Sequence, residues 1–390
     1  MSAANRHALA ADTLFDGASL RHDFAVVVEG ARIAALMPRR ELPNHISLRR
    51  LPDGAWLAPG FIDVQVNGGG DVLFNDEPTP EGIAAIVAAH RQFGTTALMP
   101  TLISDTPEKM RKALDAVQKM LGREPGVLGA HLEGPFLSRE KSGAHDPGMI
   151  RTPGPDDRAL LTSLRSGVTL VTLAPEVVPA NFIGALAASG VRVSLGHSMA
   201  TYAQTRVALD EGLTGFTHLF NAMRPLASRE GGPIAAALES TDAYYGLIAD
   251  GVHVAPTILR LALRGAGHPM LVTDAMPPVG GSRSSFELNG QKIEVRDGRC
   301  ARADGTLAGA ALDMASAVRN AVRWMQLPLP DAIKLATDVP ARFLGVSDRL
   351  GRLAPGYRAD MIALEPDAIR VLATWVAGRE YTTAPAAVVT

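Results

Sequence analysis

The stretch Leu128-Gly129-Ala130-His131-Leu132-Glu133 is a short apolar run that ends in a carboxylate, and it predicts a buried strand. Runs of this kind recur along the chain and alternate with segments of helical periodicity, a pattern typical of parallel strands joined by crossover helices. Eight such units predict a closed (β/α)8 barrel. The eight expected strands are Phe61–Val66, Thr96–Pro100, Leu128–Glu133, Thr169–Ala174, Arg192–His197, Gly215–Leu219, Tyr245–Asp250 and Met270–Asp274.

An open, doubly wound sheet is the alternative architecture for the same alternation of strands and helices. Its first strand is usually followed by a glycine-rich turn of the form G-x-G-x-x-G, which binds a dinucleotide. Here the first strand is followed by Asn67-Gly68-Gly69-Gly70-Asp71, which does not match that pattern. The sequence therefore favours the barrel.

The two ends of the chain predict a second, smaller domain. Neither residues 1–56 nor residues 347–390 are long enough to form a barrel, and chain termini often lie close together. We expect both ends to build one small β-sandwich domain, with the barrel of residues 57–346 inserted between them. The β-like runs at the two ends are Phe24–Glu29, Arg32–Met37, Asp360–Leu364 and Ile369–Val376.

Two helices and one hairpin carry clear local signals. Thr106-Pro107-Glu108 and Thr79-Pro80-Glu81 each place a capping hydroxyl, a proline and an acid in the order that begins a helix. Ser284–Asp297 predicts a hairpin after the eighth strand, with its turn at Asn289-Gly290.

Composition excludes several classes of protein. The chain of 390 residues has a single cysteine, Cys300, which excludes an intramolecular disulfide and a cysteine-rich zinc site. A net charge of −2 without a basic stripe gives no reason to expect a nucleic-acid partner. No apolar run approaches the roughly 18 residues of a membrane span, and the first residues do not resemble a signal peptide. We expect a cytoplasmic protein without a membrane partner.

Four strand ends place chemically active side chains at the same mouth of the expected barrel. They are Glu133, His197, His218 and Asp274, and catalytic groups in barrels sit at the carboxyl ends of strands. Two imidazoles and a carboxylate are a common zinc set that leaves a position open for water. Asp274 would then take the proton from that water.

Each of these residues has a plainer interpretation when it is taken alone. A single histidine at a strand end is more often structural, and Glu133 could be an ordinary ion-pair partner. The agreement of four independent strands favours the metal site. His131 is expected to support the site rather than to bind metal. Gln65 and Asn67 are neutral amides, so they are weak metal ligands, and interior hydrogen bonding is the alternative for them.

Loop residues add candidates for substrate contacts. His145, after the third strand, could donate a hydrogen bond to a developing oxyanion. Asn221, Ala222 and Arg229 follow the sixth strand, where an amide, a backbone N–H and a guanidinium could hold a phosphate or a carboxylate. His253, after the seventh strand, could join them. The alternative for Arg229 is a solvated loop charge.

Seven motifs in order resemble the N-acetylglucosamine-6-phosphate deacetylases, a family within the amidohydrolase superfamily. The resemblance extends over nearly the whole chain, and the pair THLFNAMRP and HLEGP is its most specific part. PGFID is shared by many amidohydrolases. The motifs are PGFIDVQVNG (59–68), HLEGP (131–135), GAHDP (143–147), LGHSMATY (195–202), THLFNAMRP (217–225), DGVHV (250–254) and LVTDAM (271–276).

The resemblance implies a barrel with a small β-sandwich and the hydrolysis of N-acetyl-D-glucosamine 6-phosphate to glucosamine 6-phosphate and acetate. Asp274 would be the general base and then the general acid, and His145 would polarise the acetamide carbonyl. By the same resemblance, Glu133, His197 and His218 would bind the metal. The sugar phosphate would be bound by Asn221, the N–H of Ala222, Arg229 and His253, with at least one of them from a neighbouring subunit of a homodimer.

The resemblance also bears on the number of metal ions. Many amidohydrolases carry His-x-His at the end of the first strand and bind two metals, whereas this chain has Gln65 and Asn67 there. Some deacetylases of the family share these amides and use one ion. We therefore expect one divalent metal per subunit, zinc, although a second, weaker site stays open.

Two other functions compete with this one. A related amidohydrolase could act on N-acetylgalactosamine 6-phosphate or on an N-acyl amino acid, and Arg229 and His253 would be dispensable for an unphosphorylated substrate. A non-catalytic relative with a scaffold role is the second alternative. It predicts a lost ligand or base, whereas Glu133, His197, His218 and Asp274 are all present.

Overall fold

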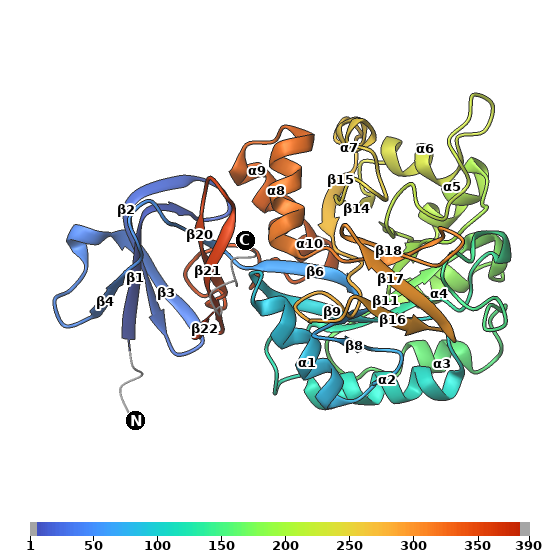
Figure 1. The fold of residues 1–390 in the computed structure, drawn as a ribbon, viewed down its shortest axis with the longest axis horizontal. Helices are drawn as coiled ribbons and strands as arrows, with labels where there is room; N and C mark the ends of the chain where they lie inside the picture. The colour runs from blue at the N-terminus through green and yellow to red at the C-terminus, as the bar shows by residue number, and fades with distance from the viewer. Residues whose placement is uncertain (1–5, 383–390) are drawn as a thin grey trace. The chain divides into compact units, whose positions relative to one another are not determined.

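The computed structural model of the protein describes residues 6–382. Eight parallel strands form one of its sheets (Figure 1). Each strand is joined to the next in the order β15-β14-β13-β12-β11-β10-β9-β6, and a parallel bridge between Val66 and Ala275 brings the two edges together. All eight expected strands are present, so the barrel is confirmed. Their bounds are β6 Phe61–Val66, β9 Thr95–Ile103, β10 Gly129–Glu133, β11 Val168–Leu173, β12 Arg192–Leu195, β13 Gly215–Phe216, β14 Tyr244–Ile248 and β15 His268–Val272.

Helices alternate with these strands along the chain. The hydroxyl of Thr106 accepts a hydrogen bond from the Lys109 N–H, so the predicted cap of α2 is confirmed. The helix α2 buries Met110, Leu114 and Val117, the apolar face that its periodicity predicts. The helices are α1 Pro80–Arg91, α2 Pro107–Met120, α3 Asp157–Leu161, α4 Phe182–Ala188, α5 Tyr202–Asp210, α6 Gly232–Glu239, α7 Pro256–Ala262, α8 Met314–Met325, α9 Leu329–Leu335 and α10 Asp338–Leu344.

The two ends of the chain share a second sheet, in a compact unit that comprises residues 6–63, 90–97 and 314–382 (Figure 1). The order is β22-β21-β20-β5-β1-β2-β3, with β4 beside β1, and the antiparallel pairing of β5 with β20 joins the two ends. Leu14, Val26, Met361 and Trp375 contribute to one shared core. The strands are β1 Arg6–Phe15, β2 Leu20–Glu29, β3 Arg32–Pro38, β4 Ser47–Arg50, β5 Trp56–Pro59, β20 Met361–Glu365, β21 Arg370–Val376 and β22 Arg379–Thr382.

Parts of the expected terminal domain, residues 1–5 and 383–390, lie outside the described residues. The other compact unit comprises Val64–Ala89 and Leu98–Asp313. No helix between residues 6 and 382 is long and apolar enough to cross a membrane.

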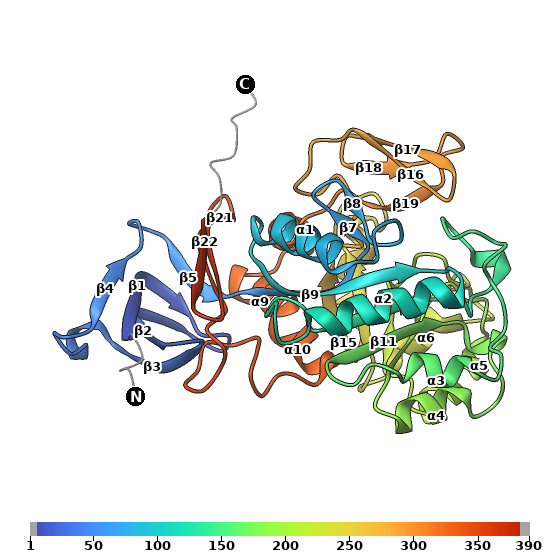
Figure 2. The same cartoon turned by 90° about the horizontal axis from the view of Figure 1, so that it is seen from below.

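A four-stranded antiparallel insert follows the eighth barrel strand, beside the hairpin of β7 (Gly68–Gly69) and β8 (Val72–Leu73) (Figure 2). Its first two strands pair across Asn289-Gly290, as the sequence predicts. The two further strands that complete it were not predicted from the sequence. The insert consists of β16 Ser285–Leu288, β17 Gln291–Arg296, β18 Arg299–Ala301 and β19 Leu307–Ala310.

Candidate active site

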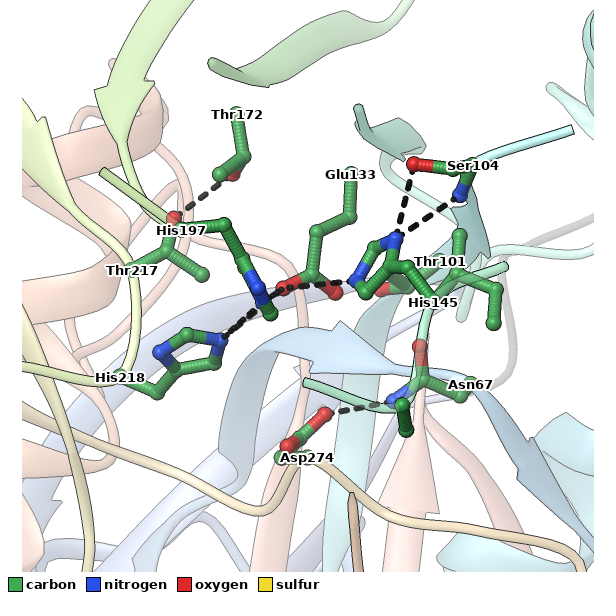
Figure 3. Close-up of polar contacts among 12 residues, drawn as sticks. Asn67, Thr101, Ser104, Glu133, His145, Thr172, His197, Thr217, His218 and Asp274 are labelled. Atoms are coloured by element: carbon green, nitrogen blue, oxygen red, sulfur yellow. Dashed lines mark hydrogen bonds and ion pairs between the residues drawn. The ribbon is translucent and has the colours of Figure 1, made fainter. Parts of the chain in front are cut away.

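The carboxyl ends of four barrel strands supply the main side chains of the site. Glu133 is the last residue of β10, and His197, His218 and Asp274 each come two residues after β12, β13 and β15. All eight strands are parallel, so these ends open at one mouth, and the four side chains are buried there. The structure therefore brings together the four residues that the strand pattern singled out (Figure 3).

Glu133, His197 and His218 form a cluster of possible metal ligands. Glu133 Oε1 lies 3.1 Å from His197 Nε2 and 3.0 Å from His218 Nε2, and the two ring nitrogens are 3.1 Å apart. One atom from each residue lies within 4.8 Å of the others. Two nitrogens and a carboxylate oxygen are donors that suit a divalent ion such as zinc. The donor set therefore fits one metal ion.

The surroundings fix how His197 faces this cluster. Its Nδ1 lies 2.7 Å from the Lys141 carbonyl oxygen, which can only accept, so Nδ1 carries the proton. Its Nε2 is then the ring nitrogen that faces Glu133 Oε1 and His218 Nε2. Lys141 belongs to the short 3-10 helix Arg139–Lys141 in the loop after β10. This carbonyl orients a ligating ring in the way that partners of metal-bound histidines commonly do.

The charges of the cluster are strongly coupled. Burial opposes ionisation of Glu133, but hydrogen bonds from His197 and His218 hold the pKa of its carboxyl well below the usual range. Burial likewise opposes a charge on His218, yet the hydrogen bond and the charge of Glu133 raise its pKa. The negative carboxylate thus attracts positive charge to its immediate neighbours. A bound cation would satisfy the same demand.

Two amides at the end of the first barrel strand hold the carboxylate of Asp274. Asn67 Nδ2 donates to Asp274 Oδ1 at 2.6 Å (Figure 3). Gln65 Nε2 donates to the same oxygen at 3.1 Å. Burial, with a further contribution from the Glu133 charge, raises the pKa of Asp274 to about 6. A pKa in this range suits a group that must both take up and release a proton near neutral pH.

His145 lies beside the cluster with a defined tautomer. The Ser104 N–H donates to His145 Nδ1 at 3.2 Å, and the Ser104 hydroxyl lies 2.8 Å from the same nitrogen (Figure 3). Nδ1 is therefore the acceptor and Nε2 carries the proton, 4.0 Å from Glu133 Oε1. Burial lowers the pKa of His145 to about 3, and neighbouring His197 adds to this effect. The neutral ring presents one N–H donor to the site.

Backbone conformation at the strand ends was not foreseen from the sequence. His197, His218 and Asp274 have φ of 50°, 33° and 50°, in or near the left-handed region that side chains other than glycine rarely adopt. Such residues cluster at functional sites, where the surrounding fold holds them. Ser104 was also missed, because a serine after a strand has no distinguishing signal until the partner ring is placed.

A cavity of about 380 Å³ opens onto these groups. Asn221, Ala222 and His253 line it together with the metal ligand candidates, His145 and Asp274. His253 Nδ1 lies 2.6 Å from Asp250 Oδ2, which leaves its Nε2 for another partner. Arg229 is exposed on the loop after β13 and lies outside the cavity lining. The structure thus brings three of the four expected phosphate contacts to the site.

Comparison with known proteins places this geometry in a family. Residues 56–383 match the model of the amidohydrolase family, so the chain belongs to that family, whose members are metal-dependent hydrolases. An N-acetylgalactosamine-6-phosphate deacetylase of Shewanella sp. (strain ANA-3) is 47% identical over 335 residues, which are 84% of each chain.

Two solved structures are similar over almost the whole chain. N-acetylglucosamine-6-phosphate deacetylase from Pasteurella multocida has a TM-score of 0.93 and 34% identity, covering 97% of this chain and 100% of its own. A mutant of the N-acetyl-D-glucosamine-6-phosphate deacetylase from Mycobacterium smegmatis, solved with N-acetyl-D-glucosamine-6-phosphate, has a TM-score of 0.89 and 36% identity. It covers 96% of this chain and 99% of its own.

The tautomer of His145 can be tested directly. In the metal-free protein, the ring should stay neutral with its proton on Nε2 from pH 7 down to about pH 5, whereas a free histidine would become mostly protonated over the same range. The reason is that its lowered pKa, about 3, lies below this range. Two-dimensional ¹H–¹⁵N spectra of the imidazoles would show it, with His145→Gln assigning the signal. Protonation above pH 5, or a proton on Nδ1, would contradict this geometry.

Proposed function

We propose that this protein hydrolyses the acetamido group of N-acetyl-D-glucosamine 6-phosphate to D-glucosamine 6-phosphate and acetate, using one divalent metal ion, zinc. The observation that carries the proposal is the convergence of Glu133, His197 and His218 with Asp274 and His145 around one cavity. The names of the two similar solved structures support the choice of substrate.

Glu133, His197 and His218 would hold the metal. When bound there, a divalent ion supplies Lewis-acid polarisation and lowers the pKa of water. Asp274 is the proton carrier: its Oδ2 accepts the proton of the attacking water while Oδ1 stays bonded to Asn67 and Gln65. The water oxygen forms a bond to the acetamide carbon.

The second half of the reaction uses the same carboxyl group. As the carbon–nitrogen bond breaks, Asp274 returns its proton to the leaving amine, which departs as glucosamine 6-phosphate with acetate as the other product. His145 Nε2–H donates to the carbonyl oxygen as negative charge develops on it. The neutral, fixed tautomer of His145 suits this task, because it needs no proton transfer to become a donor.

The phosphate would bind at the part of the cavity lined by Asn221, the N–H of Ala222 and His253. Asp250 orients His253 toward it through the 2.6 Å contact. Arg229 lies on an exposed loop, so we propose that it reaches the phosphate of a neighbouring subunit in a homodimer. These contacts would contribute binding and orientation rather than chemistry.

The amides of Gln65 and Asn67 support a single metal ion. Their NH₂ groups face Asp274 and, for Gln65, also Glu133 Oε2 at 3.2 Å. A donor NH₂ presents positive charge where a second ion would need a lone pair.

We propose in addition that the protein is cytoplasmic, and that residues 1–56 with 347–390 form the smaller domain and residues 57–346 the catalytic one.

The metal site predicts a defined stoichiometry. Purified protein reconstituted with zinc and dialysed should hold one ion per chain, as measured by atomic emission. His218→Ala removes one of three ligands and should lower zinc affinity by at least about 100-fold. His45→Ala, at an exposed histidine, is the matched control and should change nothing. A measured content of two zinc ions per chain would contradict the single metal site.

Replacing the proton carrier gives the sharpest test of the reaction. Asp274→Asn keeps the side-chain shape but cannot accept the proton, so kcat should fall by about 10²- to 10⁴-fold while zinc content stays at the wild-type value. Acetate release and metal analysis on the same sample measure both quantities. Asp242→Asn, at an exposed loop residue, is the control. Near-normal turnover of Asp274→Asn with metal bound would refute the proposed mechanism.

A substrate panel tests the identity of the sugar. N-acetyl-D-glucosamine 6-phosphate should be hydrolysed faster than its galactosamine epimer, and both faster than unphosphorylated N-acetylglucosamine. His253→Ala should raise KM for the phosphorylated substrates by about 10- to 100-fold and leave the unphosphorylated one nearly unchanged, because a charge-assisted hydrogen bond is lost. Preference for the epimer would change the assigned substrate. An equal effect on the unphosphorylated sugar would remove His253 from the phosphate site.

A further inference from the structure

The four-stranded insert β16–β19 contributes an apolar wall to the catalytic cavity. Five residues both line the cavity and belong to one hydrophobic cluster between the insert and the barrel, and we call them the apolar wall. Four of them are at most 7% exposed. The members of the apolar wall are Ile103, Ala144, Met276, Leu288 and Ala308.

The apolar wall lies next to the groups that act on the acyl carbon. Ala144 precedes His145, and Ile103 precedes Ser104, whose N–H donates to the His145 ring. Met276 comes two residues after Asp274. The wall therefore flanks the proposed carbonyl donor and the proton carrier together.

Asn221 and Ala222, two polar contacts of the cavity, come from across the barrel from Ile103 of the apolar wall. Asn221 and Ala222 follow β13, whereas Ile103 ends β9. In the ring closed by the bridge between β6 and the end of β15, three strands separate β9 from β13 in either direction. Ile103 of the apolar wall thus lies across the mouth from Asn221 and Ala222. The metal ligand candidates Glu133, His197 and His218 also line the cavity.

This polarity matches the two ends of an N-acyl amino-sugar phosphate. When the sugar phosphate occupies the polar side, the amide nitrogen points toward it and the acyl carbon chain points away, toward apolar surface. Resting on the proposed function, we propose that the apolar wall is an acyl subsite, which holds the methyl of the acetyl group and limits the length of the acyl chain that the enzyme removes.

Hydrogen bonds hold the insert against the barrel, so the position of the apolar wall is fixed. Asn289 Nδ2 and Arg302 Nη2 donate to the Ala144 carbonyl oxygen at 3.1 and 2.8 Å. The Ala310 N–H donates to the backbone carbonyl oxygen of Asp274 at 2.9 Å, and the Ala310 carbonyl oxygen accepts from the Met276 N–H at 3.0 Å. A wall fixed on both sides has little freedom to yield to a longer chain.

The experiment compares N-acetyl, N-propionyl and N-butyryl glucosamine 6-phosphate. The product glucosamine 6-phosphate is common to all three, so one amine assay gives kcat/KM for each. In the wild type, kcat/KM should fall at least about tenfold with each added methylene. Leu288→Ala should raise the propionyl-to-acetyl ratio at least about tenfold, and Leu288→Val, a milder change that protects folding, should raise it less.

Ile293→Ala is the matched control. Ile293 is fully buried in the same hydrophobic cluster on the neighbouring strand β17 but does not line the cavity. The Ile293→Ala substitution should leave the propionyl-to-acetyl ratio of kcat/KM at the wild-type value, even if the stability of the protein falls. An equal change in Ile293→Ala would attribute the effect to general loosening of the insert and overturn the subsite.

Two further results would also overturn the inference. If Leu288→Ala and Leu288→Val raise KM equally for all three substrates with an unchanged ratio, the wall contacts the sugar instead of the acyl chain. Wild-type protein that releases amine from none of the three would overturn the proposed function and this inference with it. Wild-type activity on the acetyl substrate separates the two cases.

Discussion

One carboxylate oxygen, Glu133 Oε1, lies at hydrogen-bonding distance from the imidazoles of both His197 and His218. All three residues are at most 5% exposed, and a buried negative charge is costly unless positive charge compensates it. A proton on His218 provides part of that compensation, as its raised pKa indicates. A divalent ion bound to the same three atoms would displace that proton, so metal affinity should weaken as the pH falls.

The seam at which the barrel closes carries the second constraint. The backbone N–H of Asp274 donates to the Gln65 carbonyl oxygen at 3.1 Å, and the side-chain amides of Gln65 and Asn67 donate to the Asp274 carboxylate. Hydrogen bonds from the main chain and from the side chains at the end of β6 thus both fix Asp274. Histidines at these two positions would offer lone pairs to a metal, whereas the amides offer protons to a base. The amides at the seam therefore orient Asp274 and support the proposal of a single metal ion.

How far the sequence predicts this site depends on how each residue is placed. The strand ends fix Glu133, His197, His218 and Asp274, because a parallel barrel brings all carboxyl ends to one mouth whatever the details of packing. Loop residues follow no such rule. Ser104 could not be predicted as the partner of His145, because 41 residues separate them and only the folded loop brings them together.

The insert shows the same limit on a larger scale. Its first hairpin was predictable from Asn289-Gly290, a local turn signal. The pairing of β18 with β19 was not, because these strands are three and four residues long and their register shifts between Arg299 and Ala301. The contribution of Leu288 to the cavity was equally hidden, since alternation along a strand shows which residues share a face but not what that face covers.

His131 supports the site from below, and hydrogen bonds constrain both of its ring nitrogens. His131 Nδ1 lies 3.1 Å from the Val64 carbonyl oxygen, so it carries the proton, and Nε2 must accept from the Thr172 hydroxyl at 2.8 Å. The Thr172 oxygen then accepts from Thr217 at 2.6 Å, and Thr217 accepts from Ser194 at 2.7 Å. Burial lowers the pKa of His131 to about 4, which keeps the ring neutral as this chain of donors requires. Each hydroxyl in this chain donates its hydrogen bond in one defined direction. The chain therefore joins the strands that carry the metal ligand candidates below the mouth of the barrel.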